Sequence, residues 1–521
     1  MKLAELNFGA IDAKYELLST KDGVRQKFSN SIFCPPNFSY EEFLERRKFF
    51  IYGPKGSGKT AILHHLAIEA QNKNDTHCEF ILFKEKIGEI TRRENGDLIH
   101  EVILDKKRQY INYEVIWKWF LLKKIREIVQ GKSPELFDKD ETWNSFCSSI
   151  NAAQKCLKAP KFEGIIPEFN ISLAWQFAKF AFKWQPKIVN SFYERVNSAY
   201  SCFTKLTGGE GSASIFLDEI ELSNTEKIQY EQDSLLIRDL IIVVGKMNEV
   251  CIRNNFKIGI YAAIRNEVLN APVVVGKEIN KTTEHFGFEI NWNQNVNSFD
   301  HPIISVLKQR IIGAEISAFG HRKTERILET YFPSAINSTP TQKFIIELTW
   351  MRPRDIIRLL LVLKERNPAA ETFSDHLIRD ALRAYAEKSW TEIEEDLNAK
   401  YNSNEIAYIK KLLLTLGDKF LKSKFDSQLR LDKSKNIMPD GIIESLTSDA
   451  LLHDLYRVGV IGHLTGTNRE DAVIKFFCRN NDIAIFNGTL MVHKGIKPIF
   501  FTTRDRSRNG YSRNQHSDAQ R

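Results

Sequence analysis

Apolar residues along the chain form short continuous runs and longer stretches with helical spacing. The short runs are typical of buried strands, which are apolar on both faces. They span residues 48–52, 79–83, 215–217 and 256–268. Apolar residues three and four positions apart predict helices between these runs. Such helices are expected at 60–70, 113–130 and 236–251. Strands that alternate with helices predict an α/β fold with a parallel sheet.

A different pattern occurs within residues 165–185, where FNISLAWQFAKFAFKW places apolar residues at every second position. This period predicts extended strands, arranged as a hairpin. The segment belongs to an insertion expected at about residues 100–205. Its aromatic face either docks a partner or packs on the neighbouring helices, and we favour packing, because large aromatic side chains are mostly buried.

The first apolar run leads into GPKGSGKT, residues 53–60, which fits G-x-x-x-x-G-K-[ST] at every fixed position. Strand, glycine-rich turn and helix follow in the order that a phosphate-binding loop (P-loop) requires. The motif predicts that Lys59 reaches the β- and γ-phosphates of ATP and that Thr60 binds Mg²⁺. The residues expected to bind the nucleotide are Gly53, Pro54, Lys55, Gly56, Ser57, Gly58, Lys59, Thr60 and Ala61.

A magnesium-dependent P-loop NTPase also needs a carboxylate that holds the magnesium shell. The run at 215–217 ends in Asp218-Glu219. We expect Asp218 to hold the Mg²⁺ shell and Glu219 to polarise the attacking water. The strand predicted at 256–268 ends in a polar cluster that contains Arg265 and Asn266. Ligands bind at the carboxyl ends of parallel strands, so Arg265 is either a γ-phosphate sensor or part of a surface salt bridge.

This set of motifs resembles the AAA+/STAND group of P-loop ATPases. The resemblance implies that residues 288–311 lead into a helical lid and that 348–366 contain the lid helix. Pro353 suits the first turn of that helix. It further implies a sensor-2 arginine, for which Arg354 is the first choice and Arg352 the second. The motif R-P-R-D at 352–355, with residues 378–397, is similar to a poorly characterised group of bacterial P-loop ATPases.

Arg310 is a weakly supported candidate for an arginine finger, the residue through which one subunit would complete the site of another. The expected domains follow from these assignments. They are an ATPase core at 1–290, a helical lid at 291–400, a winged-helix-like α+β domain at 401–502 and a basic tail at 503–521, expected to be disordered.

The winged-helix resemblance rests on helices followed by strands, with Asn487-Gly488 as a type I′ hairpin turn. The second helix, SDALLHDLYRVG, is more acidic than a typical DNA-reading helix. We therefore favour a packing or regulatory module. Lys494, Lys497 and the arginine-rich tail leave DNA binding open.

Composition narrows the classes of protein. The 521 residues carry a net charge of +8, are 42% hydrophobic, and contain no apolar stretch long enough to span a membrane. Seven cysteines without a C-x-x-C pattern, and no secretion signal at the N-terminus, predict a cytoplasmic protein. The twelve histidines form no metal-ligand pattern, so ATP and Mg²⁺ are the expected cofactors.

Two functions remain open. The first is an ATP-hydrolysing switch or motor that acts on a protein partner or assembles with itself. STAND-like ATPases of bacteria suggest a role in defence against phage. The alternative is a DNA-binding AAA+ protein of the initiator or transposition type, whose ATP state controls its assembly on DNA. A scaffold that binds ATP without turnover is disfavoured by Glu219.

Overall fold

A computed structural model describes residues 2–17, 22–83, 113–157, 186–220, 227–269, 279–293, 299–398, 400–439, 448–465, 473–479 and 483–501. Two compact units divide the chain. We call Asn37–Lys55 with Lys59–Ile290 the sheet unit, and Met1–Pro36, Gly56–Gly58 and Asn291–Arg521 the helical unit. The P-loop is thus shared, because its three central residues group with the helical unit.

The sheet unit is built on five parallel strands in the order β2-β3-β4-β1-β5. These are β1 (Phe50–Gly53), β2 (His77–Leu82), β3 (Ala213–Ile220), β4 (Ile258–Arg265) and β5 (Gly287–Glu289). Strands β3 and β4 are almost wholly buried, as their continuous apolar runs predict. The α/β fold with a parallel sheet is therefore confirmed.

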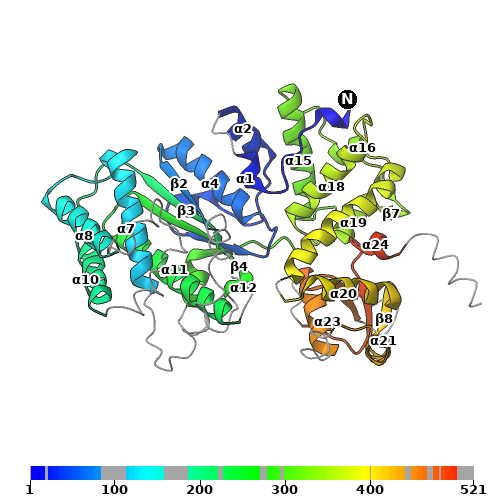
Figure 1. Ribbon diagram of the computed structural model, residues 1–521. Coiled ribbons are helices and arrows are strands. Elements are labelled where there is room, and N and C mark those ends of the chain that lie inside the picture. Colours follow the sequence, from blue (N-terminus) through cyan, green and yellow to red (C-terminus); the bar gives the residue numbers. More distant parts are fainter. Residues whose placement is uncertain are drawn as a thin grey trace, which may run out of the picture. The chain divides into compact units, whose positions relative to one another are not determined.

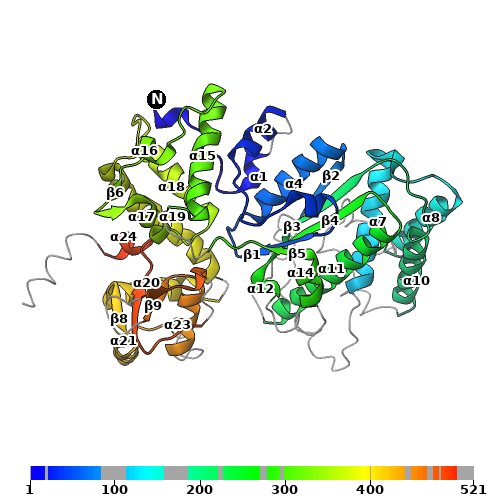
Figure 2. The ribbon, with the colours of Figure 1, turned by 180° about the vertical axis from the view of Figure 1, so that it is seen from behind.

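Helices cover this sheet on both faces (Figure 1). The helices of the sheet unit are α3 (Tyr40–Leu44), α4 (Lys59–Asn74), α7 (Tyr113–Gly131), η2 (Pro134–Leu136), α8 (Glu141–Leu157), α10 (Pro186–Phe203), α11 (Lys227–Arg253), α12 (Asn266–Leu269) and α14 (Ile279–Phe286). Helix α11 buries Leu236, Leu240, Val244, Met247 and Cys251 along one face. Helices α7, α8 and α10 lie together beyond β2 (Figures 1 and 2). The hairpin expected at 165–185 lies outside the described residues.

The helical unit starts with η1 (Leu3–Glu5), α1 (Ala13–Glu16) and α2 (Asp22–Ser31). It continues with α15 (Pro302–Phe319), α16 (Ile327–Tyr331), β6 (Ala335–Ile336), β7 (Thr339–Pro340), α17 (Thr341–Leu348), α18 (Pro353–Arg366) and α19 (Asp375–Leu397). Backbone N–H groups of Leu3 and Ala4 donate to the carbonyls of Ala370 and Pro368, at 2.7 and 3.0 Å. The N-terminal segment thus packs on this unit.

A smaller α+β subdomain follows in the same unit. It contains α20 (Ser403–Leu416), β8 (Lys419–Leu421), α21 (Lys422–Ser434), α23 (Ser448–Arg457), β9 (Ile461–Thr465), β10 (Val473–Lys475), η3 (Phe477–Arg479), β11 (Thr489–Val492) and α24 (Lys497–Phe500). The antiparallel sheet has the order β10-β9-β11-β8.

The hairpin predicted at Asn487-Gly488 is wrong. Strand β11 pairs with β9 and β8, and β10 pairs with β9. Residues 483–486 form no strand. The ring of Phe486 instead packs against Tyr456 and His453 of α23. Packing of this side chain on the helix therefore overrides a favourable turn sequence.

Candidate nucleotide site

The P-loop connects β1 to α4, as its motif predicts. Gly56 and Gly58 have φ of +78° and +97°, a backbone conformation that residues with a Cβ rarely adopt. The Lys59 ammonium group donates to the carbonyls of Gly53 and Pro54, at 2.8 and 2.9 Å. Ser57 is fully buried, and its hydroxyl has no hydrogen-bond partner among the described residues. The loop therefore has the shape and spare polar capacity of a phosphate cradle.

Asp218 and Glu219 lie near the carboxyl end of β3, where the β3–β4 register shifts between Leu217 and Ile220. Glu219 has a φ of +58°, in the left-handed region. Its backbone N–H donates to Asp218 Oδ1 at 2.8 Å. Strand bulges and left-handed non-glycine residues gather at active sites, where they aim a side chain at some cost in stability.

The pKa of Asp218 is raised to about 6, and burial of the carboxyl is the largest cause of this rise. A hydrogen bond from the Thr60 hydroxyl, the Glu219 N–H and the charge of Lys59 all oppose this rise in pKa, but they do not cancel it. The nearby Glu219 carboxylate raises the pKa further. The group is thus short of positive charge.

These contacts bear on the expected magnesium site. The Thr60 hydroxyl and the Asp218 carboxylate, the two residues assigned to Mg²⁺, interact with each other. Both offer oxygen atoms, the ligands that Mg²⁺ prefers, and phosphate and water oxygens complete such a shell. A divalent cation would also supply the charge that Asp218 lacks. The donor set therefore fits Mg²⁺ bound together with a nucleotide. No cluster of three metal-ligating side chains occurs among the described residues.

Arg265 ends β4 and pairs in register with Gly53, the first residue of the P-loop. Its side chain is half-buried. The next residue, Asn266, donates through Nδ2 to Glu289 Oε1 at 3.2 Å, which links the ends of β4 and β5. Both candidate sensor residues thus lie at the same end of the sheet as the P-loop, the end where ligands of parallel sheets bind.

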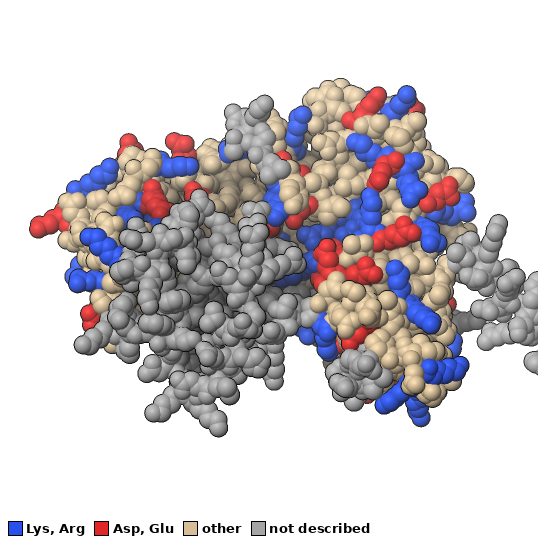
Figure 3. All heavy atoms as spheres, viewed as in Figure 1, with Lys and Arg blue, Asp and Glu red and all other residues tan. Residues whose placement is uncertain are grey.

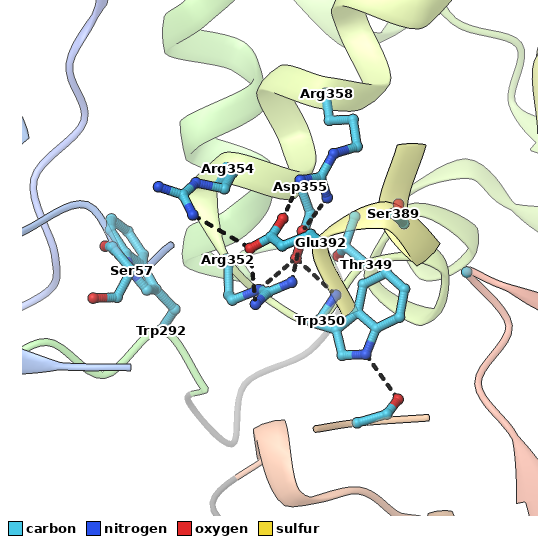
Figure 4. A network of polar contacts seen from close by, with 12 residues as sticks. Ser57, Trp292, Thr349, Trp350, Arg352, Arg354, Asp355, Arg358, Ser389 and Glu392 are labelled. Carbon is cyan, nitrogen blue, oxygen red and sulfur yellow. Dashed lines mark hydrogen bonds and ion pairs between the residues drawn. The ribbon is translucent and has the colours of Figure 1, made fainter. Parts of the chain in front are cut away.

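The lid motif forms a buried cluster of three arginines and two acids at the start of α18 (Figure 4). Arg352 donates to both oxygens of Asp355, each at 3.0 Å, and lies 3.6 Å from Glu392 Oε1. Arg358 bonds to Asp355 at 3.2 Å and also to Glu392. Arg354 forms an ion pair with Glu392 Oε1 at 3.3 Å. Pro353 begins the helix, as predicted.

Three guanidinium groups face two carboxylates, which leaves one positive charge in excess. Burial alone would raise the pKa of Glu392, but the charges of Arg352, Arg358 and Arg354 outweigh it and hold the pKa well below its usual range. Glu392 therefore stays ionised near neutral pH. Arg354 is the most exposed of the three arginines, at 22% of its side chain, against 17% for Arg352 and 5% for Arg358.

The P-loop tip adjoins this cluster within the helical unit. The backbone N–H of Arg354 lies 3.5 Å from the carbonyl oxygen of Gly56. A Cβ added to Gly56 would lie 3.3 Å from Arg354 Cβ and 3.5 Å from Arg352 Cδ. The surplus charge is therefore next to the predicted phosphate cradle, and Arg354 is better placed than Arg352 to release its partner for an anion.

Arg310 does not suit the role of an arginine finger. Its guanidinium group bonds to both oxygens of Glu16, at 2.9 and 3.0 Å, and to the Ser31 hydroxyl at 3.3 Å. Only 6% of the side chain is exposed. A residue that completes another subunit's site must reach outward, whereas this one fixes α15 to the N-terminal segment.

Sequence reasoning missed several residues of the site. Glu392 lies 38 positions after Arg354, and no local spacing links a glutamate on α19 to an arginine on α18. Arg358 could have been found, because it follows Arg354 by four positions on one helix. Trp292 donates from its indole Nε1 to the carbonyl oxygen of Ser57 at 2.8 Å. Nothing in the motif marks it.

The described cysteines are all free thiols, and none of the described helices combines the length and apolarity needed to cross a bilayer. Comparison with known proteins gives two family matches. Residues 24–87 match an ORC-CDC6-like family, and residues 304–394 match a FunZ-associated C-terminal helical domain. No curated protein matches the chain.

Among solved structures, the chain is similar to the crystal structure of Cdc6p from Pyrobaculum aerophilum. The identity is 10%, the match covers 89% of this chain and 92% of that one, and the TM-score is 0.31. The five-stranded parallel sheet and the ORC-CDC6-like match across the P-loop support an AAA+ P-loop ATPase core.

Proposed function

We propose that the protein binds ATP with Mg²⁺ at residues 53–61 and hydrolyses it through Glu219. The observation that carries this proposal is the pair Asp218-Glu219 at the bulged end of β3, where Asp218 also interacts with Thr60. A P-loop that merely bound nucleotide would not require a glutamate held in the left-handed conformation.

The side chains then divide the work. Lys59 leaves the carbonyls of Gly53 and Pro54 and binds the β- and γ-phosphates. Glu219 orients and polarises the attacking water, and Arg265 contacts the terminal phosphate. Thr60 and Asp218 would hold Mg²⁺, which would supply positive charge to the phosphate groups.

Arg354 is the residue that we assign to sensor 2. It exchanges Glu392 for a phosphate oxygen, because the cluster has one positive charge in excess. Arg352 and Arg358 keep both carboxylates paired after that exchange. Arg354 therefore changes partner while the rest of the cluster holds the start of α18 in place, and this change reports the nucleotide state to the helical unit.

We further propose that this switch acts on a protein partner or on further copies of itself, within the STAND-like branch of AAA+ ATPases. A role in bacterial defence against phage is part of the proposal and rests on that resemblance alone. The helical lid at 291–400, the winged-helix-like domain at 401–502 and a cytoplasmic location are parts of the same proposal.

DNA binding is the second candidate, and one surface favours it. On α21 the exposed cations are Lys424, Arg430 and Lys433, and the exposed Lys435 directly follows the helix. The acids of this helix are engaged: Asp432 is buried against Tyr408, and Asp426 pairs with Lys422 at 2.8 Å. Lys and Arg side chains are prominent over this part of the molecule (Figure 3).

The residues first linked to DNA offer less support. Lys494 pairs with Glu347 at 3.0 Å and lies over the ring of Phe344, and Lys497 pairs with Asp418 at 3.3 Å. The basic tail at 503–521 lies outside the described residues. The DNA candidate therefore depends on α21 rather than on the wing.

Steady-state ATPase activity tests both candidates. Turnover is measured for the wild-type protein and for Glu219→Gln, with and without duplex DNA, at two salt concentrations. We expect slow turnover without DNA stimulation, and a variant that binds ATP but does not hydrolyse it. That variant then serves to capture the protein partner in its ATP-bound state.

Strong stimulation by DNA that declines steeply with salt would replace the protein partner with DNA. Normal turnover by Glu219→Gln would overturn the role given to that residue.

A further inference from the structure

We infer that Trp292 is a positioning residue of the P-loop: its indole N–H holds the Ser57 carbonyl outward, so that the loop's N–H groups face the phosphates. The inference rests on the proposed function, because it concerns the same nucleotide site. It adds a residue that lies 235 positions after Ser57 in the chain and outside the P-loop motif.

The first step of the argument is the geometry of a phosphate cradle. When successive backbone N–H groups point toward an anion, the carbonyl groups of the same loop point away from it. Gly56 and Gly58 adopt left-handed conformations on either side of Ser57. The Ser57 carbonyl is thereby directed away from the anion site, and its hydrogen bond with Trp292 is buried.

The second step is the cost of leaving that carbonyl unpaired. A buried carbonyl without a donor is energetically unfavourable, and rotation of the peptide would relieve this. Such a rotation would turn an N–H group away from the phosphates. The indole Nε1 of Trp292 donates to the Ser57 oxygen at 2.8 Å and so stabilises the peptide in its present orientation.

The third step is that Trp292 itself is fixed. Only 5% of the residue is exposed, and the ring of Phe33 lies beside its indole, with 6.5 Å between ring centroids. Two residues earlier, the Ile290 N–H donates to the Tyr52 carbonyl at 2.8 Å and prolongs the pairing of β5 with β1. Figure 4 shows the indole directed at Ser57.

The test is Trp292→Phe, which removes the donor and keeps an aromatic ring. Trp117→Phe is the matched control, because Trp117 is also buried and donates to the carbonyl of Leu236 at the same 2.8 Å. ATP affinity, KM, kcat and the melting temperature are measured for both. We expect both variants to lose stability, and only Trp292→Phe to lose ATP affinity, about tenfold, with kcat unchanged.

Trp292→His keeps a ring N–H, and we expect its affinity to stay within about threefold of the wild type. It also answers the question if Trp292→Phe does not fold. Wild-type affinity in Trp292→Phe, or a tenfold loss in Trp292→His, would overturn the inference alone. A wild-type protein that binds no ATP would overturn the proposed function as well.

Discussion

The carboxylate pair on β3 and the arginine cluster at α18 carry net charges of opposite sign. In the first region, Asp218 and Glu219 face one cation, Lys59, and the pKa of Asp218 is raised to about 6. In the second, three arginines face two acids, and the pKa of Glu392 is lowered. Among the described residues, burial is the main influence on the carboxyl pKa in the first region, and the charges of the arginines outweigh burial in the second. Under the proposed function, a magnesium ion would neutralise the first region and an anionic phosphate oxygen would pair with Arg354 in the second.

The largest expected effect comes from Lys59→Ala. This change removes the Lys59 charge that acts on Asp218, and with it the proposed contact to the β- and γ-phosphates. We expect ATP affinity to fall at least about 100-fold, since hydrogen bonds to charged groups contribute about 1.5–3 kcal/mol each. Isothermal titration calorimetry measures the loss. Binding within threefold of the wild type would refute the P-loop assignment.

Arg354→Ala tests the other side of the comparison. We expect kcat/KM to fall about 100-fold, as for the loss of one preorganised donor to a transition state. Stability should change little, because Glu392 keeps Arg352 and Arg358.

The control is Arg358→Ala, which breaks a buried pair and should destabilise the protein by about 3–5 kcal/mol. Chemical denaturation and ATPase assays separate the two variants. If Arg352→Ala, and not Arg354→Ala, abolished turnover with the fold intact, the sensor assignment would pass to Arg352.

The raised pKa of Asp218 predicts a pH dependence. Between its ordinary value of 3.8 and about 6, the folded protein holds a proton that the unfolded chain has released. Stability without nucleotide therefore contains a contribution that is complete below pH 3.8 and is lost as the pH rises through about 6. Mg²⁺ competes with this proton, so affinity for Mg·ATP should rise about tenfold from pH 5 to 7.

Asp218→Asn provides the control for this pH dependence. The ATP affinity of this variant should vary with pH only through the titration of ATP itself. Its melting temperature should not show the fall that the wild type shows as the pH rises through about 6. The measurements are ATP titrations and thermal melts at pH 5, 6 and 7. An identical pH profile in the variant would show that another group is responsible.

The smallest expected effect is that of Gly56→Ala. The new methyl group meets Arg354 Cβ at 3.3 Å, and its residue must keep a φ of +78°. We expect about 1 kcal/mol of strain and an ATP affinity about fivefold lower. Gly320→Ala is the matched control, with a φ of +79° and no atom within 4 Å of the added Cβ. Gly320→Ala should lose stability but keep its ATP affinity. Equal ATP affinities in the two variants would show that the contact between Gly56 and the arginine cluster does not affect ATP binding.

The sequence predicted the sheet unit well because its signals are local. The run before Asp218 and the motif at 53–60 each fit within a dozen residues, and the parallel sheet then brings their ends together. The arginine cluster was found only in part. Arg354 belongs to a motif, whereas Glu392 reaches it through the packing of α18 on α19, which no periodicity encodes.

The same limit explains the errors. Asn487-Gly488 has the composition of a hairpin turn, but the flanking Phe486 packs on α23. The sequence did not show that Arg310 is paired, because its partner, Glu16, lies 294 residues earlier in the chain. Trp292 was passed over for the same reason. Pairings between distant residues are fixed by tertiary structure, and single-sequence reasoning does not reach them.

The left-handed backbone of Glu219 has a consequence for how this protein tolerates mutation. At that position the backbone conformation favours glycine or asparagine, while the proposed hydrolysis requires a carboxylate. Replacement by glycine would relieve the strain and yield a protein that is at least as stable, abundant and well folded, yet inactive. Natural variation that silences such an enzyme would collect at this residue, undetected by any screen for folding.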